Sequence, residues 1–239
     1  MRRWAAGLGL MAAVCAVSVE ARQPQRHLSA NPSAVIAAEM AFARAAQEKG
    51  QWTAFAETAA SDAVMFTPAM VYAQSWLKGR ANPAVAVKWQ PYEVWSSCDG
   101  SLVVSHGAWQ GASQGGGATG YFTTIWQRQK DGNYKWVLDA GDTLSQPLAE
   151  PEMVSAHVAD CPARRDEAQA GPPKQTSRSA LPPLDPAQRS GKSDDGTLSW
   201  TITMPPGGAR NLAVQWTKDG STQTALNETV TPSIPKAVP

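Results

Sequence analysis

The sequence predicts an α+β fold in which N-terminal helices pack on one face of a strongly curved antiparallel sheet. Apolar residues recur at spacings of three and four between residues 31 and 60, which is typical of amphipathic helices. Between residues 63 and 140 the apolar residues alternate instead, and turn sequences separate the runs, which is typical of strands joined by hairpins. Helices followed by a run of strands indicate an α+β arrangement rather than alternating α/β units.

The first predicted helix has Asn31 as its N-cap and Pro32 as its first residue, a pair that favours helix initiation. The helix is expected to extend to about Glu48 and to end at Gly50. Its buried stripe is expected to consist of Ile36, Met40 and Ala43, with Val35, Glu39 and Phe42 beside it. A second, shorter helix is predicted over residues 51–60.

The sheet is predicted to contain five strands with turns between them. Strands are expected over residues 63–66, 85–95, 102–109, 121–128 and 134–140, while residues 71–77 suit a strand or a short helix equally. Asp99-Gly100 and Asp131-Gly132 are typical hairpin turns, and the glycine-rich residues 111–120 form a longer hairpin loop. Pro91 indicates an edge or a bulge, because proline donates no hydrogen bond to a neighbouring strand.

The composition narrows the classes of function. The chain has 239 residues, of which 43% are hydrophobic and 17% charged, enough apolar material for one core. The formal net charge is +1, and the basic residues are scattered along the chain. No general electrostatic attraction to nucleic acid or to an anionic membrane is therefore expected.

The N-terminus is predicted to be a signal peptide covering residues 1–21. Arg2 and Arg3 precede an apolar run from Ala5 to Val19, and Val19-Glu20-Ala21 offers small residues at the positions that signal peptidase reads. The run is too short for a stable membrane span. The mature chain is expected to begin near Arg22 and to be periplasmic or secreted.

Removal of the signal peptide leaves Cys98 and Cys161 as the cysteines of the mature chain. An even count in an oxidising compartment favours a disulfide between them, and two unrelated buried thiols are the alternative. A bridge would stabilise the fold by about 3–4 kcal/mol through the loop that it closes.

The chain beyond the main domain divides into three segments by composition. Residues 146–161 form an exit segment, and residues 162–196 are a linker rich in proline. Residues 197–230 alternate between apolar and polar side chains and are predicted to form a small three-stranded β meander. A meander of this size is expected to dock on another part of the protein.

Residues 120–141, GYFTTIWQRQKDGNYKWVLDAG, resemble the final hairpin of SnoaL-like domains in the nuclear transport factor 2-like superfamily. In that hairpin an aromatic strand ending in Trp-x-Arg leads into Asp-Gly, and the returning strand ends in Asp near Gly. Residues 61–68, SDAVMFTP, resemble the entry of the same family into its sheet. The resemblance covers residues 31–145 and implies a cone-shaped domain. The family contains isomerases, dehydratases, hydrolases, cyclases and many proteins without catalysis.

The resemblance also implies where a site would lie. Enzymes of the superfamily place a carboxylate, often with Tyr or His, in an apolar pocket, and the candidates here are His106, Asp139 and Asp142. Asp139 is expected on the strand face opposite Trp136 and Leu138. The candidate ligand-binding residues are Trp89, Trp109, Tyr121, Trp126 and Trp136.

No cofactor is expected, and no metal site, because the sequence has no His pair or Cys cluster at ligand spacing. Two functions remain open. The cone binds a small apolar or aromatic molecule or serves as an accessory module of the cell envelope. Alternatively, it is a cofactor-free isomerase, dehydratase or hydrolase with a buried carboxylate as general base. Nucleic acid is not an expected partner, and the sequence leaves a homodimer open.

Overall fold

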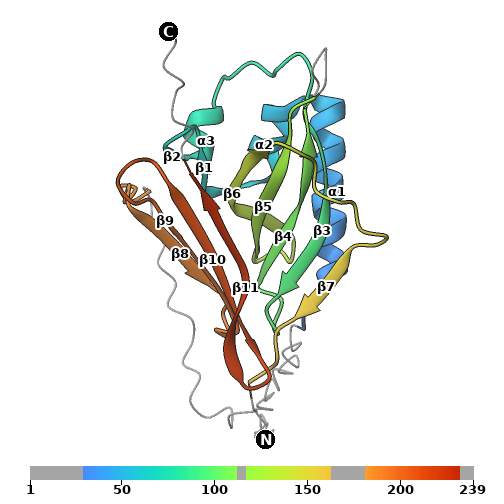
Figure 1. The fold of residues 1–239 in the computed structure, drawn as a ribbon, viewed down its shortest axis with the longest axis vertical. Coiled ribbons are helices and arrows are strands. Elements are labelled where there is room, and N and C mark those ends of the chain that lie inside the picture. The colour runs from blue at the N-terminus through green and yellow to red at the C-terminus, as the bar shows by residue number, and fades with distance from the viewer. Residues whose placement is uncertain (1–28, 112–116, 163–180, 232–239) are drawn as a thin grey trace, which may run out of the picture.

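The computed structural model describes residues 29–111, 117–162 and 181–231 (Figure 1). The expected signal peptide and residues 163–180 of the expected linker lie outside these ranges. The helices are α1 (Pro32–Lys49), α2 (Gln51–Thr58) and α3 (Ala73–Leu77). The strands are β1 (Ala59–Phe66), β2 (Met70–Tyr72), β3 (Lys88–Ser96), β4 (Leu102–Gln110), β5 (Thr119–Arg128), β6 (Tyr134–Leu144), β7 (Ser155–Val158), β8 (Gln188–Lys192), β9 (Leu198–Thr203), β10 (Arg210–Lys218) and β11 (Ser221–Val230).

The described elements form three layers, with a seven-stranded sheet in the middle (Figure 1). Helices α1 and α2 cover one face of this sheet, whose strand order is β2-β1-β6-β5-β4-β3-β7. We call these helices and the middle sheet the cone. Strands β8 to β11 form a second sheet, the accessory sheet, in the order β11-β10-β9-β8 over the other face.

The middle sheet is mixed, whereas a purely antiparallel sheet is predicted from the sequence. The β1–β6 and β3–β7 pairs are parallel, and the other pairs of the sheet are antiparallel. The parallel pairs join strands that are distant in the chain. Their relative direction is therefore not fixed by a hairpin turn, as it is for β3 to β6.

Helix α1 begins and ends as predicted but buries a different stripe. The Asn31 side chain accepts a hydrogen bond from Ala34 N at 3.3 Å, and Gly50 follows the last helical residue. Met40, expected to be buried, is 54% exposed. The buried stripe consists of Val35, Glu39, Phe42 and Ala46, at spacings of four, three and four. The predicted stripe is displaced by one residue, because Val35, Glu39 and Phe42, which were expected beside it, are the residues that face the sheet.

The strong curvature of the middle sheet is explained by one row of paired residues that crosses four neighbouring strands and contains two glycines. In this row Pro91 of β3 pairs with Gly107 of β4, then with Phe122 of β5 and Gly141 of β6. A Cβ on Gly107 would lie 2.1 Å from the Gln90 carbonyl oxygen. The neighbouring backbone thus approaches closely because the side chain is missing, and the sheet can bend there.

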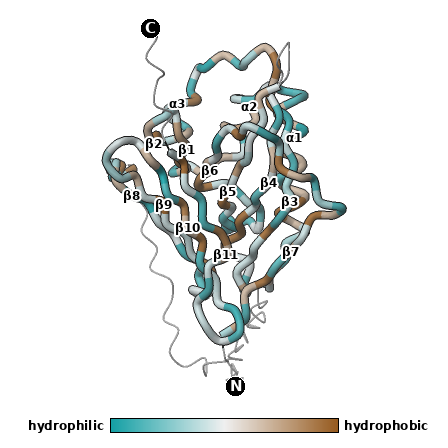
Figure 2. Tube along the Cα trace, in the orientation of Figure 1, coloured by the Kyte–Doolittle hydropathy of each residue, from teal (hydrophilic) through white to brown (hydrophobic). Residues whose placement is uncertain are grey.

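The accessory sheet shares one hydrophobic core with the cone. Its buried residues are Leu198, Trp200, Ile202, Leu212 and Val214. In Figure 2 hydrophobic segments lie along the strands, while the hairpin tip between β10 and β11 is hydrophilic. The sheet has four strands, whereas a three-stranded meander is predicted from the sequence. The additional strand is β8, which lies within residues 162–196, where the sequence indicates a linker. The sequence of β8, QRSGK, is polar on both faces and gives no alternation to detect.

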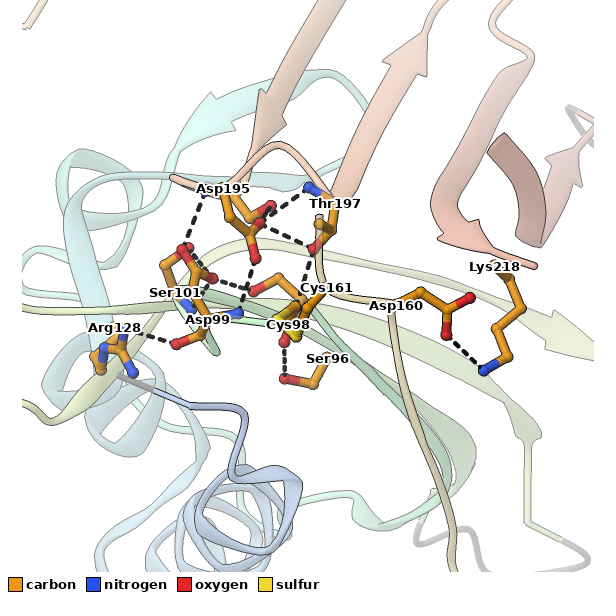
Figure 3. Close-up of a disulfide and its surroundings, with 12 residues drawn as sticks. Ser96, Cys98, Asp99, Ser101, Arg128, Asp160, Cys161, Asp195, Thr197 and Lys218 are labelled. Carbon is orange, nitrogen blue, oxygen red and sulfur yellow. Dashed lines mark hydrogen bonds and ion pairs between the residues drawn. A yellow bond between two sulfur atoms is a disulfide. The ribbon is translucent and has the colours of Figure 1, made fainter. Parts of the chain in front are cut away.

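Two turns with the same sequence pattern join the cone to the accessory sheet (Figure 3). Residues 97–101, SCDGS, and residues 193–197, SDDGT, each hold their central aspartate with hydroxyl groups of their own turn. The Asp99 N–H donates to Asp195 Oδ2 at 2.8 Å, and the Asp195 N–H donates to Asp99 Oδ2 at 3.1 Å. We call this pair of turns the reciprocal clasp.

The predicted disulfide is confirmed beside the clasp (Figure 3). Cys98 and Cys161 are bonded, with their Cα atoms 5.1 Å apart. Cys98 belongs to the turn between β3 and β4, and Cys161 follows β7. The bridge therefore fixes the exit segment to the sheet, where its strand β7 pairs with β3.

Candidate functional site

A pocket of about 400 Å³ lies between α2, the middle sheet and the first residue of β10. Its lining is mainly aromatic, with a few polar groups among the rings. The aromatic residues are Trp52, Phe55, Phe66, Trp89, Trp109, Tyr121 and Phe122. The ionisable side chains other than Tyr121 are Asp139, Asp142 and Arg210.

A β-bulge in β6 brings Asp139 into this pocket. Ile125 pairs with Leu138 and Trp126 pairs with Trp136, so Val137 is an extra residue in β6. Trp136 therefore lies on the same face as Asp139, and its Nε1–H donates to Thr58 of α2 at 3.0 Å. The sequence places these two side chains on opposite faces, because strict alternation takes no account of a bulge.

Asp139 is a half-buried carboxylate that no cation among the described residues balances. Thr124 Oγ1 donates a hydrogen bond to Asp139 Oδ2 at 2.9 Å, and no ion pair of Asp139 is found among the described residues. Burial raises the pKa of Asp139 from 3.8 to about 7. The hydrogen bond from Thr124 lowers this pKa, and the nearby Glu39 carboxylate raises it further. Asp139 can therefore hold or release a proton near neutral pH.

Glu39 is a buried carboxylate next to the site, and the sequence does not single it out as a candidate. It is fully buried in α1, and its carboxylate accepts hydrogen bonds from three side chains of the middle sheet. These come from Trp89 Nε1 at 2.7 Å, Ser105 Oγ at 2.6 Å and Trp126 Nε1 at 2.9 Å. Burial raises the pKa of Glu39, and these hydrogen bonds oppose the rise. Its position between Val35 and Phe42, at spacings of four and three, is the signal that could have revealed it.

Three of the five expected ligand-binding aromatic residues line the pocket, namely Trp89, Trp109 and Tyr121. Trp126 and Trp136 lie behind it, almost completely buried in the core. Trp89 connects the two regions, because its ring faces the pocket lining while its Nε1–H donates to Glu39.

His106 lies on the face of the middle sheet that the accessory sheet covers and is not part of the pocket lining. Its Nδ1 is 3.0 Å from Glu228 Oε1 of β11, and the Thr123 hydroxyl donates to the same carboxylate oxygen at 2.6 Å. His106 thus helps to join the cone to the accessory sheet. Asp142 lines the pocket, and its Oδ1 accepts the Thr143 N–H at 2.8 Å.

Tyr121 and Arg210 complete the polar part of the pocket. Burial, with the Glu228 and Asp142 carboxylates, raises the pKa of Tyr121 to about 12, and Arg210 opposes this rise. The Tyr121 hydroxyl therefore stays protonated at neutral pH. Arg210 comes from the accessory sheet, for which the sequence predicts no site residue. Its Nη2 donates a hydrogen bond to the Gly141 carbonyl at 2.8 Å.

The described ranges contain no group of three His, Cys, Asp or Glu side chains that could hold a metal ion. In the same part of the chain, no helix is both long enough and apolar enough to cross a membrane.

Comparisons with known proteins give matches in structure but not in sequence. No protein-family model and no curated protein matches the chain. A nuclear transport factor 2-like protein of unknown function from Shewanella oneidensis is similar over 46% of this chain and 98% of its own, at 13% identity and a TM-score of 0.38. A candidate ketosteroid isomerase from Parabacteroides distasonis is similar over 50% of this chain and 98% of its own, at 14% identity and a TM-score of 0.39.

Proposed function

We propose that the cone binds a small, largely apolar molecule with one or more rings, in a protein exported to the cell envelope. The observation that carries this proposal is the aromatic lining of the pocket between α2 and the middle sheet. A concave site of this size with many apolar walls and a few polar groups is typical of small-molecule binding sites. The aromatic rings offer flat surfaces to a ring, and Asp139 or Tyr121 can orient a hydroxyl or carbonyl group on it.

The binding proposal can be tested with 2-naphthol as a neutral probe. We expect its titration to shift the indole N–H signals of Trp89 and Trp109 in NMR spectra and to leave that of Trp200, in the accessory sheet, unchanged. Val87→Trp should weaken binding by filling the pocket, since Val87 lines it. Val85→Trp is the matched control, because Val85 is 58% exposed and is not part of the lining.

If the probe does not bind, or if the two tryptophan variants behave alike, the binding proposal is wrong.

A second candidate function is proton transfer on the bound molecule. It is favoured by Asp139, a base that lines the pocket and makes no ion pair among the described residues. In this reaction the Asp139 carboxylate removes a proton from a carbon next to a carbonyl group and returns it to the resulting enolate.

Deuterium exchange at the acidic C–H bonds of 2-tetralone in D₂O tests this candidate. We expect the wild-type protein to accelerate the exchange, with a rate that rises as the pH passes through about 7. Asp139→Asn should abolish the acceleration and still bind the ketone. Exchange at the uncatalysed rate with wild-type protein, although the ketone binds, would leave binding as the function.

Export is tested by N-terminal sequencing of the protein made by a bacterial host. We expect the mature chain to begin near Arg22 and to be recovered from the periplasm or the medium. A mature chain that still begins with Met1 would contradict export.

A further inference from the structure

We infer that the ligand of the pocket carries an oxyanion, such as a carboxylate, sulfate or phosphate, and that Arg210 of the accessory sheet binds it. This inference rests on the proposed function and makes it more specific. An apolar ring would occupy the aromatic walls, and its anionic group would lie at the side of the pocket where β10 begins.

The position of Arg210 suits an anion that approaches from within the pocket. Its Nη2 donates to the Gly141 carbonyl, and its guanidinium carbon lies 4.8 Å from the centre of the Phe66 ring. These two contacts hold the guanidinium plane against the pocket wall. Both Gly141 and Phe66 line the pocket themselves.

Arg210 also keeps donors that no acceptor in the described part of the chain uses. Its one hydrogen bond there runs from Nη2 to the Gly141 carbonyl. Its Nε atom has no partner in the same part of the chain, but it is enclosed by protein and does not face the pocket. An oxyanion in the pocket would therefore pair with the Nη hydrogens, which the guanidinium group presents in one plane.

The charges around Arg210 leave its guanidinium group available to an anion. Arg210 makes no ion pair within 4 Å among the described residues, so its charge is not already neutralised by a carboxylate. Asp142 lines the same pocket and influences Tyr121 together with Arg210. The Asp142 carboxylate is thus the nearby negative group against which the anion must bind.

The experiment compares two probes that differ mainly in charge. Naphthalene-2-carboxylate and naphthalene-2-carboxamide have the same ring and a similar shape, and isothermal titration calorimetry gives the affinity of each for the full-length mature protein. We expect the carboxylate to bind at least tenfold more tightly. The preference should increase in Asp142→Asn, which removes the opposing charge, and should fall with added salt.

Variants at Arg210 assign the preference to this side chain. Arg210→Gln should remove it, and Arg210→Lys should keep part of it, because lysine retains the charge but not the fork. Arg189→Gln is the matched control. Arg189 is also an arginine of the accessory sheet, and it contacts the cone through Asp62 at 3.2 Å but does not line the pocket. Its variant should keep the full preference.

The outcomes separate this inference from the function on which it rests. If wild-type protein binds both probes equally, or if Arg210→Gln keeps the preference while folded, the inference is wrong and the binding function stands. If neither probe binds, the binding function fails as well. Should Arg210→Gln not fold, the comparison of probes in wild type, Arg210→Lys and Asp142→Asn still decides.

Discussion

Replacement of Asp139 by Asn should stabilise the protein in alkaline solution, although it removes a polar group from the candidate site. Burial raises the pKa of Asp139 from 3.8 to about 7 in the folded state. The folded state therefore binds the proton more tightly than the unfolded state. The stability that this group contributes is fully present below about pH 3.8 and is lost as the pH rises through about 7. An uncharged Asn carries no such dependence.

The size of the effect follows from the two pKa values. At about 1.4 kcal/mol for each tenfold change in the equilibrium, ionised Asp139 costs the folded state about 4 kcal/mol. At about pH 5 the cost is smaller, because the carboxyl group is then mostly protonated in the folded state. The free energy of unfolding of Asp139→Asn, relative to wild type, should thus increase by about 2.5 kcal/mol between about pH 5 and about pH 8.

Urea unfolding followed by tryptophan fluorescence, at both pH values and with the disulfide intact, measures this difference. The Asn side chain still offers an oxygen to the Thr124 hydroxyl, so the hydrogen bond at the site is retained. Asp131→Asn is the control, because the N–H of Asn133 donates to Asp131 and lowers its pKa from 3.8. The Asp131 carboxylate is thus ionised in both states throughout this pH range, and its variant should change the stability equally at both pH values. If Asp139→Asn changes the stability equally at both pH values, the carboxylate is not desolvated as we argue.

Three further changes test the framework around the site. Replacement of Cys98 and Cys161 by serine should lower the free energy of unfolding by about 4 kcal/mol, because the disulfide closes a loop of 63 residues. A loss below about 1 kcal/mol in urea unfolding would contradict this prediction. Asp99→Ala and Asp195→Ala should each lower the free energy of unfolding by about 1–3 kcal/mol. A double-mutant cycle should show a coupling above about 0.5 kcal/mol, because the two turns bind each other. Additive effects would mean that the turns act separately. Gly107→Ala should lower the free energy of unfolding by about 2 kcal/mol or more, because the added Cβ would clash with the Gln90 carbonyl oxygen. An unchanged melting temperature would refute the role of Gly107 in the bend.

The parts of the fold that sequence predicts well are those fixed by local chemistry. The cap at Asn31 and the stop at Gly50 define α1 because both act within one turn of helix. Asp99-Gly100 lies at the turn between β3 and β4 for the same reason. Strands β7 and β8 were not predicted, because both are short and their sequences show no alternation of apolar and polar residues. They are strands only because they pair with segments that are distant in the chain.

The site was predictable only in part, because its geometry depends on interactions between distant residues. Asp139 could be named as a candidate from its place at the end of a strand, but its direction depends on the bulge at Val137. Glu39 could be placed beside the apolar stripe of α1, but its hydrogen-bond partners Trp89, Ser105 and Trp126 are 50 to 87 residues away in the chain. Arg210 is 69 residues from Gly141, its hydrogen-bond partner, and only the packing of the accessory sheet on the cone brings the two together.

The reciprocal clasp fixes the end of strand β10 that is remote from the pocket. Strand β10 extends from the region of the clasp, where Trp216 pairs with Leu198, to Arg210 at its other end. At about 3.3 Å per residue, the strand between these two residues is about 20 Å long. A change of about three degrees in its angle at the clasp would move Arg210 by about 1 Å. Such a displacement is large compared with the tolerance of a bidentate ion pair, so small changes in turns far from the pocket can alter which ligands it accepts.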